Sequence, residues 1–232
     1  MPNNLYARQA PMNLNIPPSV TIVGCGGIGS WVAILAAMSG VGTLYLFDPD
    51  VVEESNRNRL PFCQGSIGQP KVEVVKDFIL SIRPDCIIAS IAEKLEGDLL
   101  EIQKRLCDYF IECTDSPRNQ FALYNALKNT GHTFIRAGYD GTNITVTSNV
   151  SGWIKTDVET ENYTVQPSWV VPAVTVAALA VGKLLKYPEQ EVGLNLSEIG
   201  IPVVKRAERR LTKRCSTVNA NEVSRRFSNR NT

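Results

Sequence analysis

The 232-residue sequence predicts an α/β fold, a doubly wound and mostly parallel sheet with helices on both faces. Short β-branched runs alternate with segments that carry apolar residues at helical spacing, which is the pattern of repeated strand–helix units. A glycine-rich turn at residues 24–29 joins the first strand to the first helix. Apolar residues make up 44% of the chain and charged residues 20%, which is ordinary for a globular protein.

The first half of the chain predicts a strand–helix–strand unit. Residues 19–24 form a β-branched run, residues 28–40 have apolar positions at helical spacing and end at a glycine, and residues 43–47 form a second strand that ends at Asp48. A unit of about 30 residues has the right size for a right-handed parallel crossover. The chain therefore opens as the first half of a Rossmann-like fold.

The same alternation continues to residue 150. The elements that we expect next are a helix at 70–82, a strand at 87–91, a helix at 98–106, a strand at 109–113, a helix at 118–129 and strands at 133–137 and 143–150. Gly138-Tyr139-Asp140-Gly141 is typical of a turn between the last two strands, so we expect the sheet to end in mixed fashion. Residues 171–185 are apolar on nearly all sides and predict a helix buried against the sheet.

The two ends of the chain differ from this region in composition. Four prolines within residues 1–19 favour an extended arm, residues 20–200 form the predicted α/β domain, and residues 201–232 form a basic tail. Residues 203–232 hold nine Lys and Arg against two Glu, a local balance of 9 − 2 = +7. No stretch is long and apolar enough for a membrane span or a signal core, so we expect a cytoplasmic protein with no membrane partner.

The turn Gly24-Cys25-Gly26-Gly27-Ile28-Gly29 predicts a nucleotide site. The first glycine of such a turn permits the tight bend, the second lets backbone N–H groups approach a phosphate, and the third allows close helix–strand packing. Asp48 lies 24 residues beyond Gly24, where a carboxylate can accept hydrogen bonds from both hydroxyls of a ribose. These features indicate a nucleotide but do not choose between ATP and NAD.

Two polar segments favour ATP, Ser55-Asn56-Arg57-Asn58-Arg59 and Gly68-Gln69-Pro70-Lys71. The basic groups of Arg59 and Lys71 suit a triphosphate and have little use beside a nicotinamide. Lys71 falls in the first turn of a predicted helix, where a nearby anion would relieve its repulsion by the positive helix end. Asp115 ends an apolar strand at the edge where open sheets bind ligands. Its oxygen suits Mg²⁺, and capping the following helix is the alternative.

Taken in this order, the glycine turn, Asp48, Ser-Asn-x-x-Arg, Gly-Gln-Pro-Lys and Cys-Thr-Asp resemble the ThiF, MoeB and HesA family and the ubiquitin-activating enzymes. The resemblance spans about residues 5–187. It implies an adenylyltransferase of the ubiquitin-like-protein-activating type, which uses ATP and Mg²⁺ to adenylate a carboxylate. The usual substrate is the C-terminal glycine of a ubiquitin-like or sulfur-carrier protein, and a peptide is the alternative.

The resemblance also implies a role for individual residues. Asp48 would hold the ribose, Asn56 and Arg59 would contact the triphosphate, Lys71 would neutralise phosphate charge and Asp115 would bind Mg²⁺. Leu5-Tyr6-Ala7-Arg8-Gln9 resembles the family's Tyr-x-Arg-Gln segment, whose arginine enters the ATP site of the partner subunit, so a homodimer is implied. The predicted catalytic residues are Arg8, Arg59, Lys71 and Asp115, and the predicted nucleotide-binding residues are Gly24, Gly26, Gly27, Gly29, Asp48, Asn56, Arg59 and Lys71.

The cysteines depart from the pattern of the family. The chain has six, at positions 25, 63, 86, 107, 113 and 215, and no two are separated by two residues, so zinc is not expected and buried free thiols are. Residues 163–169, which precede the last apolar helix, hold no cysteine, so transfer through a protein thioester is not implied. Cys63 and the sole histidine, His132, are expected to be structural.

Four functions follow from these observations. The first is adenylation of a protein or peptide C-terminus. The second is adenylation of a carboxylate carried by tRNA, with the basic tail contacting nucleic acid, although the scarcity of aromatic residues in the tail favours a protein partner or no specific role. The third is a non-catalytic nucleotide-binding scaffold, and the fourth is an NAD oxidoreductase, against which Arg59 and Lys71 weigh.

Overall fold

The structure is a computed structural model that describes residues 5–61, 64–151, 167–188 and 190–196. The residues up to Leu194 form one compact unit, and a second unit begins at Asn195. The described residues also include short 3₁₀ helices, at Ala10–Met12 before the first strand and at Glu54–Asn56 and Gln64–Ser66 after the second. The helices and strands are, in chain order, β1 (Ser19–Val23), α1 (Gly29–Met38), β2 (Thr43–Phe47), α2 (Lys71–Ile82), β3 (Ile87–Ile91), α3 (Gly97–Leu106), β4 (Tyr109–Glu112), α4 (Pro117–Leu127), β5 (Thr133–Asp140), β6 (Asn143–Thr147), α5 (Val170–Leu185) and β7 (Val192–Asn195).

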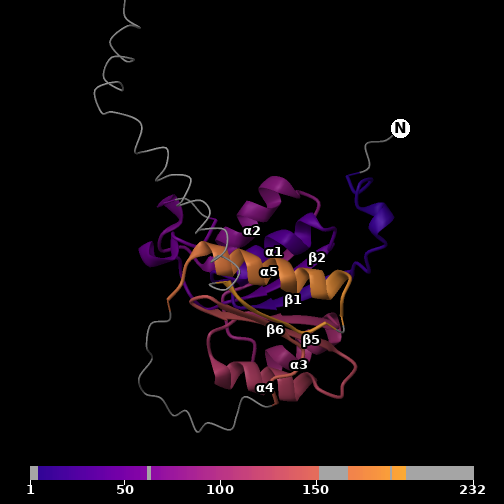
Figure 1. Cartoon of the computed structure of the whole chain (residues 1–232). Helices are drawn as coiled ribbons and strands as arrows, with labels where there is room; N and C mark the ends of the chain where they lie inside the picture. The colour runs from indigo at the N-terminus through magenta and orange to yellow at the C-terminus, as the bar shows by residue number, and fades with distance from the viewer. Residues whose placement is uncertain (1–4, 62–63, 152–166, 189, 197–232) are drawn as a thin grey trace, which may run out of the picture. The chain divides into compact units, whose positions relative to one another are not determined.

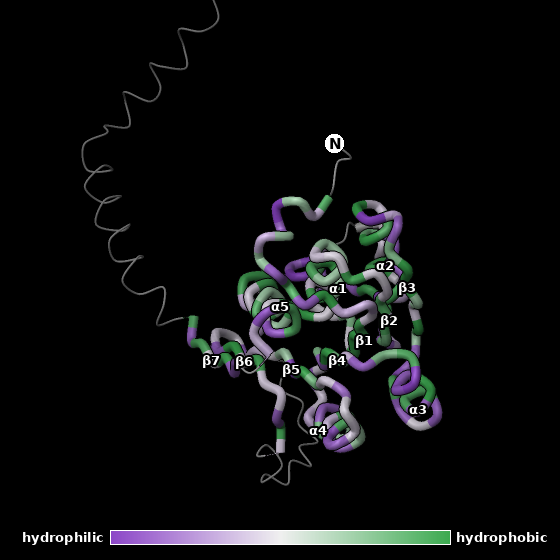
Figure 2. The backbone as a smooth tube through the Cα atoms, turned by 90° about the vertical axis from the view of Figure 1, so that its right-hand side faces the viewer, coloured by the Kyte–Doolittle hydropathy of each residue, from purple (hydrophilic) through white to green (hydrophobic). Residues whose placement is uncertain are grey.

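The strands form one sheet in the order β3-β2-β1-β4-β5-β6-β7. The pairs β1–β2, β2–β3, β1–β4 and β4–β5 are parallel, and β5–β6 is antiparallel. Helices α1, α2 and α5 cover one face of the sheet, while α3 and α4 lie on the other (Figures 1 and 2). This arrangement confirms the predicted doubly wound, mostly parallel sheet with helices on both faces.

The strands of the parallel sheet are buried on both faces. Val20, Ile22, Leu44 and Leu46 point to one face and are fully buried, and Thr21, Val23 and Phe47 are buried on the other face, as parallel strands covered by helices on two sides require. Helix α5 contacts α1, β5 and β6, and its alanines let it lie close to these neighbours. The helices and strands predicted from the sequence therefore exist, with ends that differ by up to three residues, and β7 was not predicted.

The turn expected at residues 138–141 is wrong in its position. Gly138 pairs with Thr145 and Tyr139 with Ile144, so β5 continues to Asp140. The bend falls on Gly141, which has a φ of 52° in the left-handed region that glycine tolerates. Cross-strand pairing with β6 thus overrides the local turn signal of the earlier glycine.

The proline-rich arm was expected to be extended, but it contains a short 3₁₀ helix and lies against the helices. The Gln9 side chain donates to the Ser39 carbonyl at 2.6 Å, and the Asn15 N–H donates to Leu185 at 2.8 Å. The Arg83 guanidinium lies 5.4 Å from the centre of the Tyr6 ring. These contacts attach the arm to the C-terminal ends of α1, α2 and α5.

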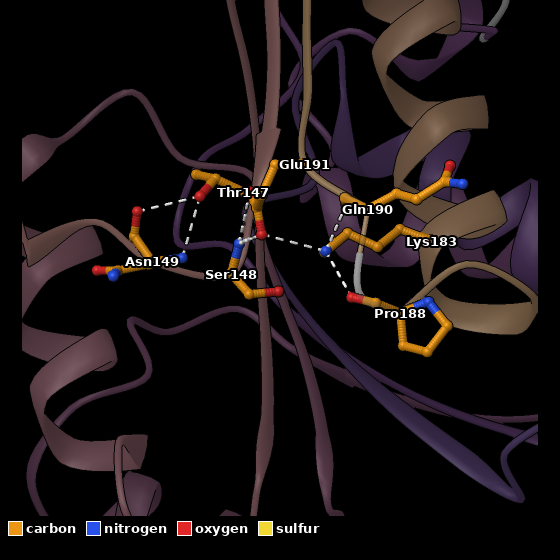
Figure 3. A network of polar contacts seen from close by, with 7 residues as sticks. All are labelled: Thr147, Ser148, Asn149, Lys183, Pro188, Gln190 and Glu191. Carbon is orange, nitrogen blue, oxygen red and sulfur yellow. Dashed lines mark hydrogen bonds and ion pairs between the residues drawn. The ribbon is translucent and has the colours of Figure 1, made fainter.

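A buried lysine, through Glu191, connects the end of α5 to the residue that follows β6 (Figure 3). Lys183 Nζ donates to the carbonyls of Pro188 and Gln190, both at 2.6 Å, and lies 3.2 Å from the carboxylate of Glu191. That carboxylate accepts the Ser148 N–H at 3.0 Å. The network satisfies a buried charge and fixes the chain after α5.

Among the described helices, none combines the length and the apolar character that crossing a membrane requires.

Candidate active site

A pocket of about 1280 Å³ lies at the carboxyl ends of the parallel strands. The glycine turn after β1 lines it, together with residues that follow β2 and β4 and residues near the end of β5. This edge is where open α/β sheets bind ligands, because strand ends and helix N-termini meet there. The predicted site residues Asp48, Arg59, Lys71 and Asp115 all line this one pocket.

The glycines of the turn differ in what surrounds them. Gly24 has a φ of 87°, so a side chain there would strain the backbone. A Cβ at Gly29 would fall on the carbonyl oxygen of Gly24, closer than van der Waals contact allows, and a Cβ at Gly27 would come 2.9 Å from Cδ of Arg59. A Cβ at Gly26 would have nothing within 4 Å. Gly26 therefore faces open space, as the approach of a phosphate to the backbone requires.

Asp48 holds the glycine turn against the end of β2. Its Oδ2 accepts the Cys25 N–H at 2.6 Å, and its Oδ1 accepts the Asp50 N–H at 2.8 Å. The side chain is buried, and this burial is the largest cause of a raised pKa, opposed by the two N–H donors and by Lys71. Each carboxylate oxygen retains acceptor capacity for a further donor from a ligand in the pocket.

Lys71 reaches the pocket because its segment is attached to the loop after β2. Val51 forms a bridge with Pro70, and the Lys71 N–H donates to the Asp50 carbonyl at 3.0 Å. Lys71 Nζ lies 2.8 Å from Oδ2 of Asp50, so this carboxylate is the anion expected near the helix end. The Asp50 side chain is 64% exposed, so the ion pair contributes little to stability and leaves Lys71 available to a ligand.

Arg59 and Asn56 are placed differently by the same short segment. Arg59 lines the pocket and donates to the Ser55 carbonyl at 2.8 Å and to Oδ1 of Asn58 at 3.0 Å. Asn56 is buried in a capping box with Glu53, and it is absent from the residues that line the pocket. A contact between Asn56 and a triphosphate therefore stays a prediction and would require the side chain to leave this cap.

Asp115 is exposed and lines the pocket, and it is not the N-cap residue of α4. The cap is Ser116, whose hydroxyl accepts the Asn119 N–H at 3.3 Å. Within the described residues, no group of three or more His, Cys, Asp and Glu side chains is placed to hold a metal ion. Mg²⁺ is commonly bound by one or two carboxylates and the phosphates of a substrate, so the arrangement at Asp115 fits a metal that arrives with a nucleotide.

Two further charged residues of the site were missed by the sequence reasoning, Glu112 and Arg136. They are register partners on β4 and β5, and both line the pocket. Glu112 is fully buried, and its Oε1 accepts the N–H of Thr114 at 2.9 Å and the Thr114 hydroxyl. Its Oε2 has no hydrogen-bond partner among the described residues. The signal in the sequence was a charged residue within an otherwise apolar strand.

Burial controls the ionisation of both groups. It raises the pKa of Glu112 to about 8, against the lowering effects of Thr114 and Arg136. It also lowers the pKa of Arg136, an effect that Glu112 opposes. Glu112 therefore carries a proton near neutral pH and can act as a hydrogen-bond donor through Oε2, since Oε1 already accepts two hydrogen bonds.

The remaining predicted residues lie away from the pocket or are structural. Arg8 is exposed on the N-terminal arm and does not line the pocket of its own chain. His132 contacts the Thr130 hydroxyl and the Lys104 carbonyl, as expected of a structural histidine. The cysteines at positions 25, 86, 107 and 113 are buried free thiols, as predicted. Cys63, Cys215, residues 163–166 and the tail at 201–232 lie outside the described residues.

With this geometry in place, comparison with known proteins identifies the family. The sequence profile of the ThiF family matches residues 17–192, so the chain belongs to this family. The predicted family is thereby confirmed.

Curated relatives share part of the chain. Over 124 residues it is 32% identical to tRNA threonylcarbamoyladenosine dehydratase of Haemophilus influenzae, a match that covers 53% of this chain and 48% of that protein. Over 98 residues it is 35% identical to sulfur carrier protein ThiS adenylyltransferase of Escherichia coli, covering 42% and 39%. The matches therefore span about half or less of the length of these relatives.

Solved structures agree with the fold. The crystal structure of MccB of Escherichia coli with ATP superimposes with a TM-score of 0.67 and 22% identity, covering 84% of this chain and 72% of that one. At this identity the likeness supports the architecture of the sheet and helices alone.

Alanine substitutions at Gly29 and at Gly26 should affect the stability of the protein differently. We expect Gly29→Ala to lower the free energy of unfolding by about 3 kcal/mol or more, because the new methyl group would displace the backbone of the turn. Gly26→Ala should change it by less than about 1 kcal/mol, since its methyl group enters open space. Urea unfolding followed by circular dichroism measures both, and equal losses in the two variants would contradict the observed packing.

The buried carboxyl group of Glu112 should make the free energy of unfolding depend on pH. Glu112 has a raised pKa in the folded chain, so its contribution to stability is complete below pH 4.5 and is lost as the pH rises to about 8. Between pH 5 and 7.5 this group alone should remove roughly 3 kcal/mol from the free energy of unfolding. Glu112→Gln should abolish that part of the pH dependence.

Urea unfolding at pH 5 and pH 7.5 measures the difference between the wild-type protein and the variant. The exposed Glu101 provides a matched control, Glu101→Gln, which should leave the pH dependence unchanged. The same pH dependence in wild type and Glu112→Gln would show that Glu112 is ionised in the folded protein.

Proposed function

We propose that this chain adenylates a carboxylate with ATP and Mg²⁺, and that the substrate is the C-terminus of a small ubiquitin-like or sulfur-carrier protein or of a peptide. The observation that carries the proposal is the convergence of the glycine turn, Asp48, Arg59, Lys71 and Asp115 on one pocket. Membership of the ThiF family and a relative named as an adenylyltransferase support the activity. The volume of about 1280 Å³ exceeds the usual range for one small ligand and leaves room for a second substrate.

Each element of the pocket would have one task in binding ATP. Asp48 would accept hydrogen bonds from the ribose hydroxyls, because it lies at the end of β2 with acceptor capacity remaining. The open backbone at Gly26 and the N-terminus of α1 would bind the phosphates. Arg59 and Lys71 would neutralise the phosphate charge, and Lys71 would then share its contact with Asp50.

In the reaction, an oxygen of the substrate carboxylate forms a bond to the α-phosphorus of ATP. The bond between that phosphorus and the oxygen bridging to the β-phosphate breaks, and pyrophosphate leaves with the electron pair. No proton is transferred in this step. The arginine and lysine would lower the repulsion between the anions that meet, and Mg²⁺ held at Asp115 would supply further positive charge at the phosphates.

Two substitutions test the adenylation. Asp115→Ala and Lys71→Ala should each lower the exchange of labelled pyrophosphate into ATP by about 10²-fold or more, because each removes charge stabilisation of the transferred group. The exchange is measured with purified small proteins that end in Gly-Gly as carboxylate donors. Asp108→Ala and Lys128→Ala, which change exposed residues outside the pocket, serve as controls.

Absence of exchange with every carboxylate donor tested would reject the adenylation. Binding of ATP without any cleavage between the α- and β-phosphates would then favour the non-catalytic scaffold. Binding of NADH in a spectral titration, with no binding of ATP, would favour the oxidoreductase.

The proposal includes a homodimer in which Arg8 acts on the site of the other subunit. Arg8 is exposed and lies outside the pocket of its own chain, which is the placement that action across subunits needs. If the proposal is correct, Arg8→Ala and Asp115→Ala are each inactive alone but recover about a quarter of wild-type exchange when they are refolded together, because half of the dimers are mixed and one of their two sites is intact. An inactive mixture, with mixed dimers demonstrated by mass spectrometry, would contradict the role of Arg8.

Adenylation of a carboxylate carried by tRNA is the second candidate. It is favoured by the identity of 32% with a tRNA threonylcarbamoyladenosine dehydratase and by the nine basic residues between positions 203 and 232. Replacing these nine residues by glutamine in the full-length chain should weaken tRNA binding and reduce its salt dependence by several units in a log–log plot. Fluorescence anisotropy at several salt concentrations measures this, and unchanged binding would count against the second candidate.

A further inference from the structure

The guanidinium of Arg136 lies over Gly138, in the space that a side chain at position 138 would fill. Arg136 and Gly138 are two residues apart on β5, so they share a face of the sheet. A Cβ at Gly138 would fall on Cζ and both Nη atoms of Arg136, closer than any real contact. The side chain therefore bends along β5 towards the carboxyl end of the strand, where both residues line the pocket.

Glu112 lies beside this arginine on β4. The two residues are register partners in a parallel pair, so their side chains point to the same face of the sheet. Glu112 is fully buried, and its Oε2 lacks a hydrogen-bond partner among the described residues, although Thr114 satisfies Oε1. A buried polar atom without a partner is costly, and its presence in a pocket wall points to a ligand that completes it.

The strand order places this pair away from the predicted phosphate site. Along the sheet edge the groups follow the order β2, β1, β4 and β5, which carry Asp48, the glycine turn, Asp115 and Arg136 respectively. Neighbouring strands are about 4.8 Å apart, so Arg136 belongs to a strand roughly 10 Å from the one that ends in the glycine turn. The triphosphate already has the turn, Arg59 and Lys71, and Arg136 lies on the far side of Asp115 from them.

We propose that Arg136, placed by Gly138 and adjoined by Glu112, binds the carboxylate of the acyl substrate before it attacks ATP. This inference rests on the proposed adenylation and specifies which part of the pocket receives the second substrate. A planar guanidinium donates two parallel hydrogen bonds to a carboxylate, which fixes both the position and the orientation of the attacking oxygen. Glu112, protonated near neutral pH, adds a donor and no competing negative charge.

The experiment uses the full-length protein with Mg²⁺ and the α,β-methylene analogue of ATP, which cannot be cleaved to pyrophosphate. The probe is N-acetyl-glycylglycine with a free carboxylate, and its C-terminal amide is the control ligand. Arginine Nε–H resonances are recorded in ¹⁵N-correlated NMR spectra, and Arg136→Gln assigns the Arg136 resonance by its disappearance. The exposed Arg105 lies outside the pocket and provides an internal reference.

We expect the Arg136 resonance to shift with the free carboxylate at millimolar concentration and to stay unchanged with the amide. The Arg105 resonance should respond to neither. Gly138→Ala should weaken the response of Arg136 about tenfold or more, because the new methyl group takes the place of the guanidinium while the arginine itself is retained.

Three results would overturn the inference. They are an equal response to the amide, no response to the carboxylate up to about 50 mM, and an undiminished response in Gly138→Ala. If Gly138→Ala does not fold, the comparison of the responses to the carboxylate and to the amide in the wild-type protein tests the role of Arg136. Failure of the ATP analogue to bind would contradict the proposed function, and the carboxylate titration of the nucleotide-free protein would then still test Arg136.

Discussion

The contact between the first residue of α1 and the glycine turn is the constraint on which the site depends. The backbone of Gly29 lies so close to the carbonyl of Gly24 that no side chain fits between them, and Gly24 itself needs a positive φ. This contact brings the N-terminus of α1 to the end of β1 and leaves the backbone at Gly26 facing the pocket. The N–H groups available to a phosphate are thus a consequence of helix–strand packing.

The parallel sheet then distributes the other binding groups. Because every strand from β3 to β5 runs in the same direction, their carboxyl ends meet at one edge, and residues far apart in the chain line one pocket. Each group is attached locally as well. Asp48 accepts backbone N–H groups on both oxygens, and the bridge between Val51 and Pro70 carries Lys71 to the same edge. These local attachments hold Asp48 and Lys71 at the edge of the sheet that carries the glycine turn.

Charge and burial divide the pocket into two parts. Near the glycine turn Asp48 is buried but Asp50 is exposed, and the ion pair of Lys71 and Asp50 can therefore rearrange around a ligand. Beyond Asp115, the pocket wall holds the buried Glu112 and the half-buried Arg136. Burial raises the pKa of Glu112 and lowers the pKa of Arg136. A triphosphate suits the first part, and the proposed carboxylate site uses the second.

Hydrophobic periodicity and glycine spacing determined much of this protein at the level of the sequence. They predicted the elements up to α5 and the doubly wound sheet, because helix and strand periods and the glycine turn are local properties of the chain. The family was predicted from a resemblance carried by five motifs in order, the glycine turn, Asp48, Ser-Asn-x-x-Arg, Gly-Gln-Pro-Lys and Cys-Thr-Asp. Asn56 is held in a capping box by Glu53, three residues away, a local contact that the sequence reasoning missed. The position of the β5–β6 turn and the pairing of Lys71 with Asp50 were decided by contacts between elements. So was the placing of Glu112 beside Arg136, since strand register brings together residues that are 24 positions apart, and local pattern carries no information about register.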